Sequence, residues 1–212
     1  MRYILFLFFI SINIISFAQI PDYTDMRSNR ESFNRMSNKI IRNDLTAFTI
    51  GGIAESVNKP VLQKFPVSKY GDDFITYDSN NFQVTIKTKT FFVAKHKLMY
   101  DGDGKYLVKI DNKPYYGNYT KVPQSGISLI VLAGKDTVAI PPSAYADLYN
   151  PHFTYRTNSG ELQSQDAVFI SADKHRIYVY MLNKDDHGSY EVTWIFQDNK
   201  YLRRVLDYGF TP

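Results

Sequence analysis

The chain has 212 residues, a formal net charge of +4 and no cysteine. The lack of cysteine excludes thiol catalysis, thiolate zinc sites and iron–sulfur clusters, and the weak net charge argues against a nucleic-acid partner. The length favours one domain, and the aromatic content of 16% favours β-strands, in which flat side chains pack well on a pleated face.

The first eighteen residues have the pattern of a secretory signal peptide. Arg2 supplies a positive charge, an apolar run begins at Ile4, and the small residues Ser16 and Ala18 stand where signal peptidase needs them. The apolar run is shorter than the roughly 20 residues of a bilayer-spanning helix. We therefore predict a signal peptide over 1–18, no transmembrane segment after its removal, and a periplasmic or secreted protein; an uncleaved anchor is the alternative. The Ser-Phe-Ala-Gln ending of this leader resembles signal peptides common in the Bacteroidota.

Residues 19–45 form a polar segment without the alternation of a strand. Apolar residues spaced three and four apart within it predict a short helix over about 28–42, with Ser28 as the N-cap residue. Residues 45–53 then alternate between apolar and polar side chains around a glycine pair, which predicts a strand with a bulge.

Residues 46–212 are predicted to form a single β-rich domain, because alternating strands and turn sequences follow one another at short intervals. The predicted strands cover 82–92, 105–110, 127–133, 137–140, 168–172, 177–182, 190–196 and 201–205. One short helix is expected over 144–149 with Ser143 as its N-cap, and residues 157–165 are interpreted as a loop. Together these elements predict a mainly β fold, an antiparallel β-sandwich or barrel-like pair of sheets, with a short N-terminal helix and one short mid-chain helix.

Two groups of aromatic residues are the strongest candidates for a ligand-binding site. The first group lies in a predicted loop and the second surrounds the predicted mid-chain helix; the tyrosines are Tyr115, Tyr116 and Tyr119 in the first, and Tyr145, Tyr149 and Tyr155 in the second. Exposed loop tyrosines present an apolar face with a polar tip to sugars, peptides or partner surfaces. Core packing of the same rings is the alternative, since one helical turn would place Tyr145 and Tyr149 on a shared face.

Asp185, Asp186 and His187 place two carboxylates beside an imidazole, a combination that can bind a metal or transfer protons. A glycine follows them at a predicted hairpin tip, where a turn requires these residue types, so a turn is the competing interpretation of these catalytic candidates. The sequence Asp101-x-Asp103 resembles the start of a calcium loop but lacks a closing glutamate, and no two histidines have the spacing of a helical zinc site. We therefore predict no metal site and no cofactor.

These patterns leave three hypotheses of function. The first is an exported, non-enzymatic β domain that binds a glycan, a peptide or an envelope protein through its aromatic loops. The second is a hydrolase of cell-envelope or glycan substrates that uses the side chains of 185–187. The third is a structural subunit of an envelope assembly, with the polar segment 20–45 as the arm that contacts a partner. The one tight basic cluster, Lys95-His96-Lys97, is interpreted as a solvated strand edge.

Overall fold

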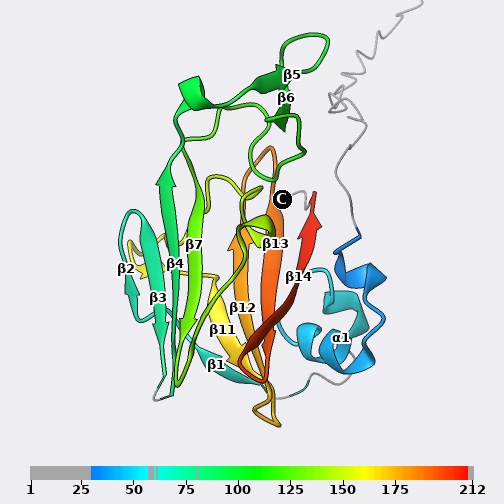
Figure 1. Cartoon of the computed structure of the whole chain (residues 1–212), viewed down its shortest axis with the longest axis vertical. Coiled ribbons are helices and arrows are strands. Elements are labelled where there is room, and N and C mark those ends of the chain that lie inside the picture. Colours follow the sequence, from blue (N-terminus) through cyan, green and yellow to red (C-terminus); the bar gives the residue numbers. More distant parts are fainter. Residues whose placement is uncertain (1–29, 57–59, 61, 80, 210–212) are drawn as a thin grey trace, which may run out of the picture.

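The structure is a computed structural model, and it describes residues 30–56, 60, 62–79 and 81–209. Two five-stranded antiparallel sheets pack face to face in a sandwich-like arrangement (Figure 1). One sheet has the strand order β1-β11-β12-β13-β14, and the other has the order β2-β3-β4-β7-β8. The predicted mainly β fold is therefore confirmed.

The strands and helical turns have the following bounds. The first sheet contains β1 (Gln63–Phe65), β11 (Ala167–Ile170), β12 (Arg176–Asn183), β13 (Tyr190–Gln197) and β14 (Lys200–Tyr208). The second contains β2 (Lys69–Tyr70), β3 (Phe74–Asp78), β4 (Gln83–Thr90), β7 (Ser125–Ala133) and β8 (Thr137–Ala139). Two small hairpins pair β5 (Leu98–Tyr100) with β6 (Leu107–Ile110), and β9 (Tyr155–Arg156) with β10 (Leu162–Gln163). The helical elements are α1 (Lys39–Leu45) and the 3₁₀ turns η1 (Phe33–Arg35), η2 (Ile53–Glu55), η3 (Val93–Lys95) and η4 (Pro142–Ala144).

The main core lies between the two sheets, as the period-two pattern of the strands predicts. Val84 and Ile86 of β4 are fully buried, and Val192, Trp194 and Phe196 of β13 belong to the same buried cluster. Successive side chains of a strand point to opposite faces, so every second residue of each strand enters this core. The C-terminal meander β11 to β14 and the hairpin β7–β8 form as the sequence predicts.

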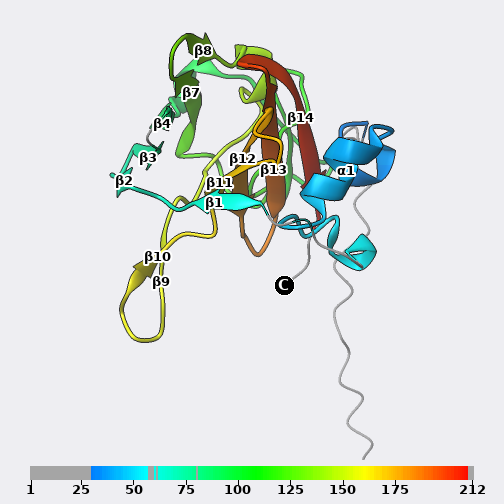
Figure 2. The ribbon, with the colours of Figure 1, turned by 90° about the horizontal axis from the view of Figure 1, so that it is seen from below.

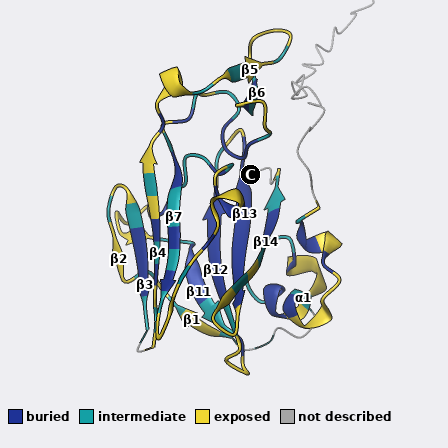
Figure 3. Cartoon of the chain, in the orientation of Figure 1, coloured by how far each residue is buried: buried dark blue, intermediate teal, exposed yellow. Residues whose placement is uncertain are grey.

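The first described segment, residues 30–56, covers the outer face of the first sheet (Figure 2). Phe33 and Leu45 are buried there, in a second cluster with Tyr178 and Ile195 of the sheet. Strand β13 is consequently buried on both faces (Figure 3), whereas a sandwich strand commonly has one face in water. The N-terminal segment is thus a third layer of the fold.

The helix of this segment is displaced from the predicted range 28–42. A 3₁₀ turn, η1, comes first, and α1 begins only after Asn38, whose side chain accepts hydrogen bonds from the backbone amides of Ile40 and Ile41. The predicted cap, Ser28, lies outside the described residues. With seven residues, α1 is the longest helix in the described part of the chain, where no helix is long and apolar enough to cross a membrane.

The predicted strand over 45–53 is wrong, because these residues form turns that lead into η2. A carboxylate takes the place of a strand partner: Glu191 of β13 accepts hydrogen bonds from the backbone amides of Ile50 (2.9 Å) and Gly51 (2.6 Å). The same carboxylate accepts a hydrogen bond from the hydroxyl of Tyr180 (3.0 Å). Burial raises the pKa of Glu191, and the two amides counter that rise.

We expect the substitution Glu191→Ala to loosen the N-terminal segment from the sheet. Each lost hydrogen bond to a buried carboxylate is worth about 1.5–3 kcal/mol, so amide hydrogen exchange at Ile50 and Gly51 should accelerate by at least about tenfold. Hydrogen–deuterium exchange resolved by residue measures this rate. The exposed Glu161 offers a matched control, since Glu161→Ala should leave the exchange of both amides unchanged. Equal exchange rates in the two variants would contradict the role given to Glu191.

The predicted mid-chain helix over 144–149 is also wrong, since only the 3₁₀ turn η4 forms there. The backbone of this stretch pairs with a distant segment instead. The amide of Tyr116 donates to the carbonyl of Asp147, and the amide of Tyr149 donates to the carbonyl of Tyr116. The loop predicted at 157–165 carries β10, the second strand of a small hairpin.

Candidate ligand-binding pocket

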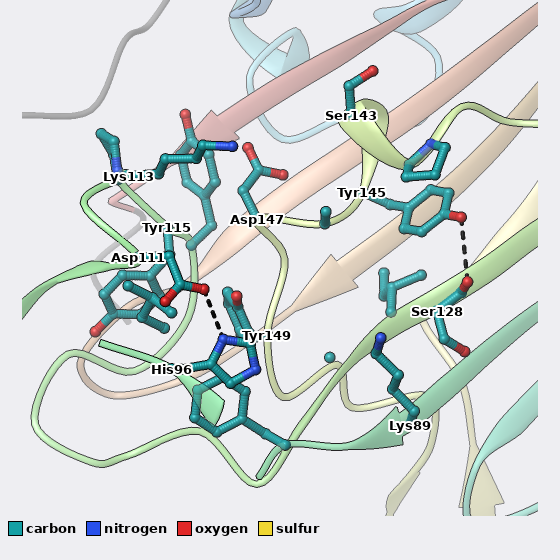
Figure 4. Close-up of a pocket in the computed structure, with 18 of the residues that line it drawn as sticks. Lys89, His96, Asp111, Lys113, Tyr115, Ser128, Ser143, Tyr145, Asp147 and Tyr149 are labelled. Carbon is teal, nitrogen blue, oxygen red and sulfur yellow. Dashed lines mark hydrogen bonds and ion pairs between the residues drawn. The ribbon is translucent and has the colours of Figure 1, made fainter. Parts of the chain in front are cut away.

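A pocket of about 850 Å³ opens where β4 ends and β7 begins (Figure 4). Its other walls come from residues 30 and 31, from His96, from residues 110–116, from residues 142–149 and from Arg204 of β14. The wall segments 110–116 and 142–149 are held together by backbone hydrogen bonds between Tyr116 and the stretch 147–149. The pocket therefore depends on a contact between two irregular segments that are far apart in the sequence.

Four of the six tyrosines predicted as ligand-binding residues line this pocket: Tyr115, Tyr116, Tyr145 and Tyr149. The structure thus joins one pair from each of the two predicted aromatic groups. Tyr119 and Tyr155 are not part of the lining. Tyr155 lies on the hairpin β9–β10 and is 44% exposed.

The four tyrosines of the lining are not exposed loop side chains, and three of them are buried, as the alternative of core packing predicts. Tyr115, Tyr116 and Tyr145 are each only 5% exposed, and the absence of a helix means that Tyr145 and Tyr149 share no helical face. The hydroxyl of Tyr145 donates a hydrogen bond to the carbonyl of Ser128 (3.2 Å; Figure 4). These rings form fixed walls, because packing and hydrogen bonds hold them in place.

Tyr149 is the best candidate for direct contact with a ligand. Its side chain is only partly buried, and its ring packs edge-on against Phe91 (5.4 Å between centroids) and Tyr115 (5.8 Å). Burial, followed by the charges of Asp111 and Asp147, raises the pKa of Tyr149. The hydroxyl therefore remains protonated at neutral pH and can donate a hydrogen bond.

His96 and Asp111 form a hydrogen-bonded pair in one wall of the pocket (Figure 4). The Nδ1 atom of His96 lies 2.7 Å from Oδ2 of Asp111, and the imidazole stacks on Phe91 at 4.3 Å between centroids. The hydrogen bond from His96, with that from the backbone amide of Lys97, lowers the pKa of Asp111. Asp111 is thus a charged acceptor beside the pocket.

Arg204 and Asp147 form the most strongly bonded pair in the lining. Two parallel hydrogen bonds, of 2.6 and 2.7 Å, run from the guanidinium of Arg204 to the carboxylate of Asp147. The guanidinium also donates to Glu31 (2.7 Å) and to the carbonyl of Ala144 (3.1 Å). Burial alone would lower the pKa of Arg204, but Asp147 and Glu31 outweigh it and raise that pKa. Arg204 is therefore permanently charged and holds η4 against β14.

Both signs of charge meet in the pocket. The lining contains the cations Arg30, Lys89, Lys113 and Arg204 and the carboxylates Glu31, Asp111 and Asp147. Donors and acceptors therefore share the lining with the aromatic rings. Such a lining suits a small ligand that offers both hydrogen-bond donors and acceptors.

No protein-family description, curated protein or solved structure matches this chain.

The catalytic candidates Asp185, Asp186 and His187 lie outside the pocket, in the turn between β12 and β13. Oδ1 of Asp185 accepts hydrogen bonds from the side-chain amide of Asn118 (2.5 Å) and from the backbone amide of His187 (3.1 Å). Asp186 and His187 are exposed. Gly188 has a positive φ and lies so close to a neighbouring backbone that no side chain would fit. The turn interpretation accounts for all of these contacts.

The acidic turn at Asp101 also has a structural explanation. Oδ1 of Asp101 accepts hydrogen bonds from the backbone amides of Lys105 (2.7 Å) and Tyr106 (2.9 Å). Within the described ranges, no three His, Asp or Glu side chains are grouped so that they could hold a metal ion.

Sequence reasoning assigned neither His96 nor any charged side chain of the lining to a ligand site; the charged ones are Arg30, Glu31, Lys89, Asp111, Lys113, Asp147 and Arg204. Lys89, Asp111 and Asp147 stand in turns or at a strand end, where charged residues are common. Arg203 and Arg204 point to opposite faces of the predicted strand 201–205, and the sequence does not indicate which of the two is buried.

Proposed function

We propose that this protein is an exported, non-enzymatic β domain that binds a small polar ligand, a saccharide of one to a few units, in the tyrosine-lined pocket. One observation carries the proposal: four tyrosines from two distant segments converge on one pocket together with paired charges. Export is proposed from the signal-peptide pattern of residues 1–18.

The size and the chemistry of the pocket support a saccharide. A volume of about 850 Å³ lies within the range of small-molecule sites. Sugars combine apolar C–H faces with many hydroxyls, which need aromatic rings together with hydrogen-bonding groups. Asp111 is a charged acceptor, and Lys89 and Lys113 are donors, in the same lining.

The bonding of the polar side chains supports binding rather than catalysis. Arg204 and Asp147 are occupied with each other, and the hydroxyl of Tyr145 is bonded to a backbone carbonyl. The His96–Asp111 pair has the geometry of an oriented base, but among the described residues no serine hydroxyl is hydrogen-bonded to His96. A hydrolase of envelope or glycan substrates would need a nucleophile or an acid in addition.

We expect Tyr149→Ala to weaken saccharide binding about tenfold, because an aromatic contact is worth roughly 0.5–1.5 kcal/mol and the hydroxyl adds a hydrogen bond. Isothermal calorimetry would follow a thermal-shift screen with glucose, galactose, N-acetylglucosamine, galacturonate and their short oligomers. Tyr149→Phe, which keeps the ring, should bind with an intermediate affinity. Tyr155→Ala is the matched control and should bind as the unchanged protein does.

The same screen separates the proposal from its alternatives. Equal affinity in the Tyr149→Ala and Tyr155→Ala variants would rule out this pocket as the saccharide site. Turnover of an oligosaccharide would revive the hydrolase, and a flat saccharide panel with a well-folded protein would favour a peptide ligand or an envelope assembly.

A further inference from the structure

Residues 89–113 form a projection at one end of the molecule, which we call the tip. It begins in the last two residues of β4 and continues through η3 and the hairpin β5–β6, which extends beyond the sandwich (Figure 1). Much of the tip is exposed to solvent (Figure 3). The tip includes the basic cluster that the sequence singled out.

The tip carries an unusual share of exposed apolar side chains. Phe92 is 57% exposed, Val93 49%, Met99 37% and Tyr100 42%. These are four of the ten large apolar side chains that are exposed in the described part of the chain. Large exposed apolar groups that gather in one region commonly mark a contact with a partner or a membrane.

The tip also carries most of the net charge. It contains six lysines and three aspartates, a formal charge of +3, while the whole chain has +4. The ammonium group of Lys95 lies 5.0 Å from the centre of the Phe92 ring, so cationic and apolar groups alternate at short range. An anionic surface is the electrostatic complement of such a tip.

We propose that the tip docks the protein onto an anionic lipid bilayer, with Phe92 and Val93 among the headgroups and the lysines against the lipid phosphates. Each lysine close to an anionic bilayer is attracted by the negative surface potential, and the apolar side chains add the free energy of their transfer out of water. A bilayer can deform around the projecting tip and therefore needs no complementary shape. A protein partner would instead need a complementary face that buries on the order of 1,000 Å².

This docking would place the pocket close to the bilayer, because Lys89, His96 and Lys113 belong to both the tip and the pocket lining. The proposal does not depend on what the pocket binds.

The chain contains no cysteine, so a single introduced cysteine can carry a fluorophore that reports on its surroundings. Val93→Cys samples the tip. Leu202→Cys is the matched control, since Leu202 is 48% exposed and lies on β14. Both proteins are purified from the exported fraction of the expressing cells, so that the leader is treated alike in both. With vesicles of phosphatidylglycerol and phosphatidylcholine, we expect a blue shift of the label at 93 and none at 202.

Vesicle co-sedimentation of unlabelled variants tests the two contributions separately. The double variant Phe92→Ser/Val93→Ser and the double variant Lys95→Glu/Lys97→Glu should each bind anionic vesicles at least tenfold more weakly. Ile40→Ser/Ile53→Ser, which alters side chains 61% and 62% exposed elsewhere, should bind as the unchanged protein does. Pure phosphatidylcholine vesicles, or salt raised to 0.5 M, should remove most of the binding.

Equal shifts of the labels at 93 and 202 would overturn the proposal, and so would unchanged binding of the two tip variants. Binding to polyglutamate in the absence of any binding to vesicles would overturn it in favour of an acidic protein partner. All variants alter exposed side chains, and their unfolding temperatures should match that of the unchanged protein.

Discussion

Arg204→Met is expected to lower the free energy of unfolding by about 3 kcal/mol, the lower end of what breaking a buried ion pair costs. Methionine keeps most of the volume of the side chain but removes all of its hydrogen bonds. Asp147 then loses both bonds of its carboxylate, and the carbonyl of Ala144 keeps only the indole N–H of Trp194. The lower end of the range applies because the side chain of Asp147 is 26% exposed, so water can replace some of the hydrogen bonds that its carboxylate loses.

Urea denaturation followed by circular dichroism measures this loss. Arg203 is the matched control, since it is adjacent on β14 but only partly buried, and Arg203→Met should change the free energy of unfolding by less than about 0.5 kcal/mol. Arg204→Lys keeps the charge without the paired hydrogen bonds, so its free energy of unfolding should lie between those of Arg204→Met and Arg203→Met. A loss below 1 kcal/mol for Arg204→Met would mean that Arg204 does not hold η4 to the sheet.

Asp166→Asn is expected to stabilise the protein at neutral pH and to flatten its pH dependence. Oδ1 of Asp166 accepts a hydrogen bond from the backbone amide of Leu182 (2.9 Å), but Oδ2 is buried and has no hydrogen-bond partner in the described residues. Burial raises the pKa of Asp166 well above its ordinary value of 3.8, and the amide of Leu182 only partly offsets this. Asparagine keeps the accepting oxygen and carries no charge.

The sign of the effect follows from proton linkage. Between the ordinary pKa and the raised pKa, the folded protein holds a proton that the unfolded chain has released. The free energy of unfolding contributed by Asp166 therefore falls as the pH rises through this window, by about 1.4 kcal/mol per pH unit. Below about pH 4 both states are protonated and the contribution no longer changes.

Chemical denaturation at several pH values between 4 and 8 tests this prediction. The variant should be more stable than the unchanged protein at pH 7, and the two should converge towards pH 4. Asp186→Asn, at an exposed position, should keep the pH dependence of the unchanged protein. Parallel pH profiles for Asp166→Asn and the unchanged protein would show that Asp166 ionises normally in the folded state.

The strands of the C-terminal meander could be predicted because each has an alternating pattern and ends in a turn sequence. Strand β1 could not, since it is only three residues long, and Pro60 before it and Pro66 after it are typical of irregular connecting segments. Residues 45–53 alternate like a strand, yet most of their amides bond to nearby carbonyls in turns, and the amides of Ile50 and Gly51 bond to the side chain of Glu191. A strand needs a partner, and the sequence alone does not say whether the partner is backbone or side chain.

The aromatic residues of the pocket could be predicted as a group, because their density along the chain is high. Their burial could not. Tyr116 and Tyr149 meet through backbone hydrogen bonds between segments that show no regular pattern, so nothing local indicates the contact. The sequence indicated the tip only through Lys95-His96-Lys97. Phe92 continues the alternating pattern of the predicted strand 82–92, whereas β4 ends at Thr90 and leaves Phe92 exposed.

The attachment of the N-terminal segment to β14 has a consequence for the rate of folding. The amide of Phe33 donates to Asp207, 174 positions away, and Arg204 bonds to Glu31, 173 positions away. Contacts between such distant residues form slowly, because the chain loses conformational entropy on closing the loop before the contact contributes its stabilising free energy. Moreover, β14 is the last strand of its meander, and the segment has no complete surface to dock on until that strand has paired. Folding should therefore take milliseconds to seconds, with the closure of residues 31–33 onto β14 as its final step.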